Sequence, residues 1–380
     1  MADNSRFDDI RPYTDTEVPA AMERIAGHSL FPLLASYVFP GGDIDEVRRM
    51  VGGIRTTAEF QRRVMFKMNE RIIANTITEF TYGGLDNLTA DTYLYVSNHR
   101  DIVLDSSLMQ NVLLANGHQT SEITFGANLM QSQLVVDIGK CNKMFKVERP
   151  GSDMRAFYRA SLHLSDYIRT AISQNHHSVW IAQRNGRTKD GLDQTDQGLI
   201  KMLCMSGGAD RVRSIADLHI LPVAVSYEWE PCDVLKTLEL YERRQLEHYV
   251  KKPGEDLNSI ITGIVQPKGR VHIEFCKPVL AADIEPCATL AAGDFHRAVA
   301  AVVDRRIKVA YRLYPNNFIA YDLRHGTRRF ADRYTDDEQT AFEQRLSKLS
   351  QYEETCDLPT LTDIFLGIYS NPVESTDIKD

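Results

Sequence analysis

The sequence of 380 residues lacks any apolar run of the ~18–20 residues that a membrane-spanning helix needs. Its most apolar segment, Leu30–Phe39, is shorter than that and is interrupted by Pro32. Residues 1–18 are too acidic for a signal or transit peptide. We therefore expect a cytoplasmic protein, in which residues 30–39 either form core between helices or dip into a membrane surface.

The chain also lacks an excess of positive charge, because 52 Asp and Glu residues outnumber 44 Lys and Arg residues and give a formal net charge of −8. Nucleic acids favour proteins with a clustered positive surface, so we expect no nucleic-acid partner. The six cysteines form no C-x-x-C pair, which argues against a zinc knuckle. Dinucleotide, nucleoside triphosphate, serine-hydrolase and zinc-protease motifs are all missing. We expect neither a cofactor nor a resident metal.

The pattern of apolar residues divides the chain into three parts. Residues 1–82 show helical spacing and no strand pattern, which predicts a small N-terminal helical domain. Residues 83–331 alternate β-rich runs with helical stretches, which predicts an α/β fold with a mixed, largely parallel sheet flanked by helices. Residues 332–380 are expected to form a C-terminal helix and a tail. The predicted strands are Thr92–Ser97, Glu122–Gly126, Ser178–Gln183, Leu218–Glu228 and Val271–Phe275.

The first predicted strand ends in a group of polar residues, Asn98, His99 and Arg100, and Asp105 follows shortly after. Five residues separate His99 from Asp105. At a turn from a strand into a helix, that spacing can bring the carboxylate to one imidazole nitrogen and leave the other nitrogen free to accept a proton. His99 and Asp105 are therefore the candidate catalytic pair.

This segment resembles the first motif of the glycerolipid acyltransferase family, which contains the glycerol-3-phosphate and lysophosphatidate acyltransferases. The family has one residue fewer between its His and Asp, so Asp101 is a weaker alternative to Asp105 as the partner of His99. Its second motif is an aromatic residue followed four positions later by arginine, which Phe145 and Arg149 match. The resemblance implies that Arg149 holds the phosphate of the acceptor.

The third family motif normally reads Glu-Gly-Thr-Arg-Ser after a strand. Gly186 and Arg187 match its glycine and arginine, whereas Asn185 or Arg184, depending on the alignment, stands in place of the glutamate. Because that glutamate helps to hold the acceptor in the family, its loss bears on acceptor identity more than on the base. The resemblance assigns acceptor binding to this segment, with Thr188 and Lys189 as supporting residues.

The fourth family motif is an apolar strand that carries a proline, and residues 220–226 match it through Pro222. Together the four motifs imply an O-acyltransferase that moves a fatty acyl chain from acyl-CoA or acyl carrier protein to a hydroxyl of glycerol-3-phosphate or a lysolipid. They also imply a protein that is peripheral to the cytoplasmic face of the membrane.

Two alternatives remain at the level of sequence. The first is a non-catalytic relative that binds a lipid or an acyl carrier, since the third motif lacks its glutamate. The second is a metal-dependent hydrolase, because imidazoles and carboxylates suit several divalent ions. The candidate ligands for such an ion are His99, Asp101, Asp105, His176 and His177.

Overall fold

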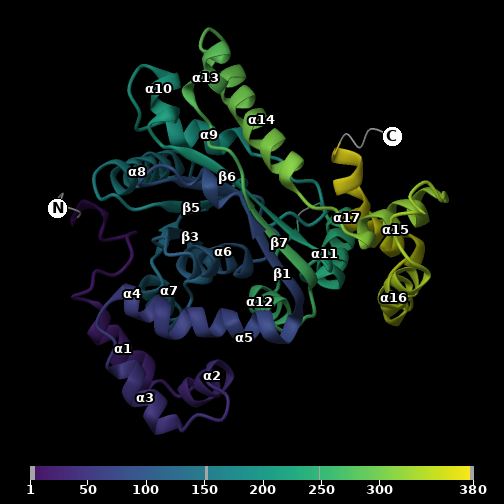
Figure 1. Ribbon diagram of the computed structural model, residues 1–380, viewed down its shortest axis with the longest axis horizontal. Helices are drawn as coiled ribbons and strands as arrows, with labels where there is room; N and C mark the ends of the chain where they lie inside the picture. Colours follow the sequence, from purple (N-terminus) through teal and green to yellow (C-terminus); the bar gives the residue numbers. More distant parts are fainter. Residues whose placement is uncertain (1–4, 150–152, 248, 377–380) are drawn as a thin grey trace.

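The computed structural model describes residues 5–149, 153–247 and 249–376, which build an α/β fold around one seven-stranded sheet (Figure 1). The strand order is β1-β7-β6-β2-β5-β3-β4. Strands β2 to β6 run parallel to one another, whereas β7 is antiparallel to β6 and β1 is parallel to β7. The strands are β1 (Ile77–Gly83), β2 (Leu94–Ser97), β3 (Glu122–Gly126), β4 (Met144–Val147), β5 (Val179–Ala182), β6 (Ile220–Tyr227) and β7 (Gly269–Phe275).

The predicted fold class is confirmed, because the sheet is mixed, largely parallel and flanked by helices. All five predicted strands are present, and they are the five inner strands of the sheet, β2, β3, β5, β6 and β7. Strand β2 is buried at every position between its parallel neighbours β5 and β6. A central, fully buried position explains why its sequence is a continuous apolar run.

The two strands that the sequence did not reveal are β1 and β4, which form the edges of the sheet. Strand β1 follows helix α5 (Phe66–Thr76) directly and is only partly buried, so its sequence lacks a core pattern. It lies before the predicted boundary at residue 82, yet it pairs with β7 along its whole length. The sheet therefore extends into the segment that we expected to be entirely helical.

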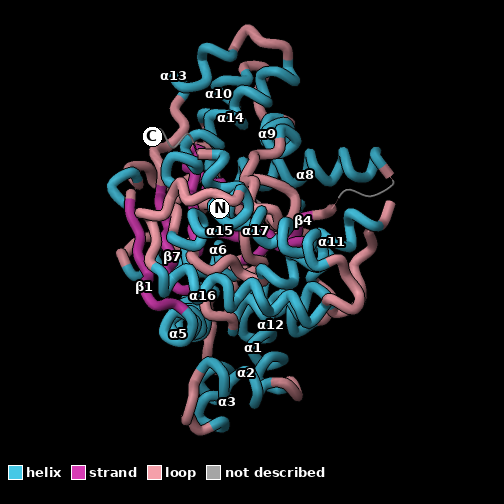
Figure 2. The backbone as a smooth tube through the Cα atoms, turned by 90° about the vertical axis from the view of Figure 1, so that its right-hand side faces the viewer, coloured by secondary structure: helices cyan, strands magenta, loops and turns pink. Residues whose placement is uncertain are grey.

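Helices cover both faces of the sheet, as Figure 2 shows in a view turned by 90°. One face packs against α8, α9 and α14, and the other packs mainly against α5 and α6. Helix α8 begins where Asp153 accepts hydrogen bonds from the backbone of residues 155 and 156. The helices of the central domain are α6 (Leu104–Ala115), α7 (Gln133–Cys141), α8 (Met154–Ser173), α9 (Gln197–Cys204), α10 (Arg211–Ala216), α11 (Asp233–Gln245), α12 (Glu255–Val265), α13 (Ala281–Ile284) and α14 (Ala292–Ala310).

The N-terminal helices form a small layer with its own apolar core below the sheet (Figure 1). This core is shared with α7, through Cys141 and the partly buried Leu134 and Ile138. The helices are α1 (Val18–Gly27), α2 (Phe31–Val38), α3 (Ile44–Gly52) and α4 (Thr57–Phe60), and a π-helical turn, Gln61–Met65, joins α4 to α5.

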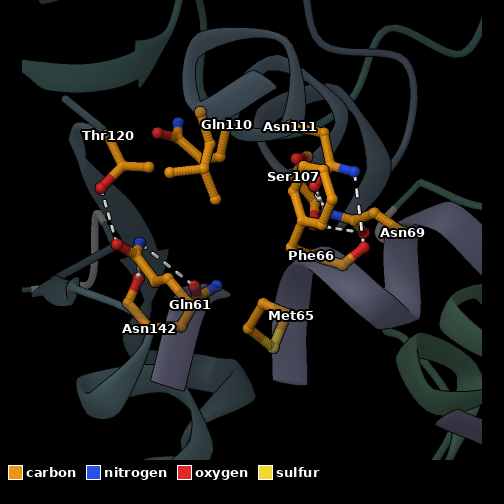
Figure 3. A pocket seen from close by; sticks show the side chains of 10 residues that line it. Gln61, Met65, Phe66, Asn69, Ser107, Gln110, Asn111, Thr120 and Asn142 are labelled. Atoms are coloured by element: carbon orange, nitrogen blue, oxygen red, sulfur yellow. Dashed lines mark hydrogen bonds between the residues drawn. The ribbon is translucent and has the colours of Figure 1, made fainter. Parts of the chain in front are cut away.

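A small polar cavity lies where this turn and α5 meet α6 (Figure 3). Amide side chains line it and bond to one another: the Asn69 amide donates to Asn111 at 2.8 Å, and the Thr120 hydroxyl donates to Gln61 at 2.6 Å. Because these amides satisfy one another, the cavity is a polar joint between the N-terminal helices and α6.

The C-terminal segment differs from the expected helix and tail. Helix α16 (Asp336–Leu346) begins after Thr335, whose side chain and that of Glu338 form a reciprocal capping contact. The following residues are not a tail, because α17 (Leu358–Ser375) buries most of its length against α15 (Pro315–His325) and α11. None of the helices in the described part of the chain is both long and apolar enough to cross a bilayer.

Helix α17 approaches the loop after β5 so closely that only glycine fits there. Gly191 has a φ of +79°, and a Cβ atom at this position would lie 2.2 Å from the backbone oxygen of Ile368. The Asn371 amide donates a 2.7 Å hydrogen bond to the Asp190 carbonyl next to it. This contact fastens the loop to the C-terminal helix.

We predict that Gly191→Ala lowers the free energy of unfolding by more than the ~1 kcal/mol that a left-handed φ alone costs. Gly326→Ala is the matched control, because Gly326 has a φ of +63° and open space around its Cβ position. Denaturant unfolding of both variants measures the difference. Equal losses would show that the Ile368 contact does not constrain the loop.

Candidate active site

The predicted site residues lie on the loops that follow the carboxyl ends of the strands. Strands β2 to β6 are parallel, so the loops that follow them all begin at the same end of the sheet. These carboxyl ends of the strands are where α/β proteins usually bind ligands. His99 follows β2, Arg149 follows β4, and Arg187 follows β5. The structure therefore brings three of the four sequence motifs to loops at the same end of the sheet.

His99 and Asp105 form a hydrogen-bonded pair. The Nδ1 atom of His99 lies 2.9 Å from Oδ2 of Asp105, which stands in the first turn of α6. Asp105 is completely buried, whereas the His99 side chain keeps 14% of its surface exposed. The ring of Trp180 on β5 packs edge-on against the imidazole, with 5.7 Å between the two ring centroids. The pairing leaves Nε2 of His99 available to accept a proton.

Three further donors hold the Asp105 carboxylate in place. The backbone N–H groups of Arg100 and Asp101 donate to Oδ2 at 2.6 and 2.9 Å, and the Tyr227 hydroxyl donates to Oδ1 at 2.8 Å. Burial and the nearby Asp105 carboxylate raise the pKa of Tyr227 well above its ordinary value, so this hydroxyl keeps its proton. The carboxylate thus has one fixed orientation toward His99.

Asp101, the alternative partner, has a different role. Its Oδ1 accepts hydrogen bonds from the backbone of Val103 and Leu104 at 2.8 and 2.9 Å, which caps the start of α6. Its other oxygen is buried against Gly263 of α12 and has no hydrogen-bond partner among the residues that the structure describes.

The residue after His99 is the centre of a buried network of four charges. Arg100, only 1% exposed, pairs with Asp193 at 2.7 Å and with Glu230 at 3.1 Å. Lys236 pairs with Glu230 at 2.5 Å and donates a 2.7 Å hydrogen bond to the Arg100 carbonyl. Burial alone would lower the pKa of Arg100, but chiefly the charge of Asp193 raises it well above its ordinary value. The two cations and two anions balance, which a buried network requires.

The two predicted acceptor arginines differ in exposure. Arg187 is buried, and its Nη1 atom has no hydrogen-bond partner among the described residues. Arg149 is exposed beside Gly126, where β3 ends. The backbone N–H of Thr188 donates to the His99 carbonyl at 2.7 Å, which ties the loop of Arg187 to the loop of His99.

Asp256 at the start of α12 shares the charge environment of both arginines. Burial alone would raise the pKa of Asp256, but Lys251, Arg149 and Arg187 lower it below its ordinary value. Its carboxylate pairs with Lys251 and accepts a 3.0 Å hydrogen bond from Asn128. Three cations therefore act on this one carboxylate, and we call these four residues the arginine cluster.

The remaining residues of the third motif are placed apart from this cluster. Asn185 is exposed, and Gly186 has a φ of +75° with open space around it. The Lys189 ammonium pairs with Glu239 on α11, and burial lowers its pKa to about 8. Lys189 is thus committed to a protein carboxylate.

The other supporting residues have structural positions. Asn98 bonds to both backbone groups of Val225, at 2.8 and 2.9 Å, and so extends the pairing of β2 with β6. Phe145 is fully buried in the core, and Pro222 is a buried residue of β6 opposite Val96. These residues hold the loops without reaching the site.

Sequence reasoning missed several residues that surround the site, and their shared feature is unmet hydrogen bonding. In the described part of the chain, nearly all buried polar side-chain atoms without a hydrogen-bond partner lie on or just after the loops that follow the carboxyl ends of the strands. No sequence signal marks them, because each is a single polar residue in an ordinary loop. They are Asn128, Gln183, Asp193 and Thr195, and they share this feature with Asp101, Arg187 and Thr188, which the sequence had already indicated.

The candidate ligands of the metal-hydrolase alternative lie at opposite ends of the strands. His176 and His177 precede β5, and His177 pairs with Glu122 at the start of β3, whereas His99 follows the end of β2. Within residues 5–149, 153–247 and 249–376, no group of three or more His, Cys, Asp or Glu side chains is placed to hold a metal ion.

We predict that Arg100→Met destabilises the fold by about 3–5 kcal/mol, because it leaves buried carboxylates without a compensating charge. The control is Arg213→Met, whose arginine is 80% exposed and lies 3.9 Å from Asp217, and which should cost less than about 1 kcal/mol. Denaturant unfolding measures both. A small loss for Arg100→Met would mean that the network contributes little to stability.

Comparisons with known proteins add one distant likeness. No protein-family model matches the sequence. No curated protein matches it either. Among solved structures, the chain is similar to the 1-acyl-sn-glycerophosphate (LPA) acyltransferase PlsC from Thermotoga maritima, with 14% sequence identity, a TM-score of 0.36, and coverage of 77% of this chain and 94% of that one. A likeness this distant does not establish a shared reaction, so the chemistry has to come from the residues themselves.

Proposed function

We propose that this chain is an O-acyltransferase that moves a fatty acyl group from a thioester carrier, acyl-CoA or acyl carrier protein, to a hydroxyl of an anionic glycerolipid acceptor. The observation that carries the proposal is the His99–Asp105 pair, in which a fully buried carboxylate with three other donors fixes an imidazole that is still partly exposed. Such a pair is suited to removing a proton from a hydroxyl.

The reaction needs no covalent acyl-enzyme. Nε2 of His99 takes the proton of the acceptor hydroxyl while the oxygen attacks the thioester carbonyl. The carbon–sulfur bond then breaks, and the leaving thiolate receives the proton from the imidazolium. Asp105 stays ionised throughout and stabilises the imidazolium between these two steps.

The arginine cluster supports an anionic acceptor. Arg187 presents an unpartnered, buried Nη1 atom, and a guanidinium grips phosphate or carboxylate oxygens through paired N–H groups. Thr188 links the Arg187 loop to the His99 carbonyl, so an anion held there keeps the rest of the acceptor beside the imidazole. The proposed acceptor is glycerol-3-phosphate or a lysolipid, and the proposed location of the reaction is the cytoplasmic face of a membrane.

The alternative that remains is a non-catalytic relative that binds lipid or acyl carrier, because Asn185 or Arg184 replaces the motif glutamate. Such a protein would have no use for a free Nε2 atom. Activity and binding measured on the same variants separate the two proposals.

We predict that His99→Ala lowers kcat for acyl transfer by about 10²–10⁴-fold and that Asp105→Asn lowers it comparably, since it fixes the wrong imidazole tautomer. Lipid mass analysis of purified protein with acyl-CoA and an acceptor panel measures transfer. Thermal unfolding checks that His99→Ala keeps its fold. A folded His99→Ala protein with most of its activity would refute the proposed base, and a wild type that binds lipid but transfers nothing would favour the non-catalytic alternative.

We also predict that Arg187→Met raises KM for the acceptor by roughly 10- to 150-fold, which corresponds to one charge-assisted hydrogen bond, with a smaller effect on KM for the acyl donor. Arg297→Met on α14 is the matched control, because Arg297 is exposed and pairs only with Asp294 of its own helix among the described residues. If both variants changed KM equally, Arg187 would not be an acceptor ligand.

A further inference from the structure

Helix α12 has two faces of opposite character. Its inner face lies over the site: a Cβ atom on Gly263 would meet the Asp101 carboxylate at 2.2 Å, Ser259 is buried, and Asp256 joins the arginine cluster. Its outer face carries Leu257, Ile261 and Val265, spaced four residues apart, with 61%, 52% and 56% of their surfaces exposed. One helix therefore has the candidate active site on one side and an open apolar stripe on the other.

A second exposed apolar patch lies on α2. Leu30, Leu33 and Leu34, at the start of α2, are exposed, and Leu33 reaches 69%. Helices α2 and α12 both pack against α5, and Figures 1 and 2 both place them at the lower side of the molecule. The shared packing runs through Tyr37 of α2 and Ile264 of α12, which contact the same hydrophobic cluster.

The charges around these patches do not oppose an anionic surface. Residues 29–42 contain no charged side chain, and residues 18–76 hold eight basic and six acidic residues, although the whole chain has a net charge of −8. Residues 242–265, which include α12, hold four basic and four acidic residues, and Lys251 and Lys252 pair there with Asp256 and Glu242. The acidic excess of the chain is thus located elsewhere, which suits contact with anionic headgroups.

We propose that the apolar stripe of α12 docks on a lipid bilayer together with the α2 patch. Because both helices pack against α5, we treat the two patches as parts of one docking surface, although they come from distant parts of the sequence. The choice of a bilayer as the occupant rests on the proposed function, since the acceptor and the acylated product are lipids. Asp256, on the inner face of α12, belongs to the arginine cluster. Docking through the outer face of this helix therefore holds the cluster near the lipid headgroups.

The test is binding to vesicles of phosphatidylethanolamine and phosphatidylglycerol, measured by sedimentation with full-length protein. We expect a Leu257→Ser, Ile261→Ser double variant to lower the partition coefficient roughly tenfold or more. Val309→Ser is the matched control: Val309 is 83% exposed on α14, which covers the face of the sheet opposite to α5, and its loss should leave binding unchanged. Thermal unfolding checks that the variants are folded.

Unchanged binding of the folded double variant would overturn the proposal. So would a wild type that forms a dimer without lipid and loses it in the double variant, because the stripe would then face a second copy of this chain. If the double variant does not fold, Ile261→Trp replaces it, and brominated lipids should quench the new fluorescence, whereas Val309→Trp should not be quenched. The assay measures no acyl transfer, so its failure is separate from a failure of the proposed reaction.

Discussion

The geometry of the site depends on the buried charges of Arg100, Asp193, Glu230 and Lys236. These side chains join the loops after β2, β5 and β6 to α11, and none of them can leave its partner without exposing a charge to an apolar interior. The backbone of Arg100 is fixed at both ends of this arrangement: its carbonyl accepts from Lys236, and its N–H donates to Asp105. His99 is therefore oriented by groups that have no contact with its free nitrogen.

The fold could be predicted where packing is strong enough to shape the sequence. Strand β2 is buried on both faces and reads as an apolar run, so its place in a parallel sheet was evident. Strand β1 packs on one neighbour only and remains half exposed, and a pattern that weak does not distinguish it from the end of α5. Helix α17 was missed for a different reason, because its burial depends on α11 and α15, which lie far away in the sequence.

The site could be predicted only where several residues of one segment act together. His99 and Asp105 are close in sequence, and the turn between them brings them together as the spacing predicted. The choice between Asp105 and Asp101 depended on the path of the backbone, since Asp101 caps α6 and turns away from the imidazole. Tyr227 and Asp256 reach the site from separate elements, and neither stands in a pattern that would identify it.

The contact of Gly191 with helix α17 has a consequence for how the protein is made. The loop that carries Arg187 obtains one of its fixed boundaries from Ile368 and Asn371, almost two hundred residues later in the chain. During synthesis from the N-terminus, the sheet can therefore pair while this loop still lacks that support. Ordering of the Arg187 loop is then among the last steps of folding, and a chain that ends before α17 would keep most of its sheet and lose the position of the loop.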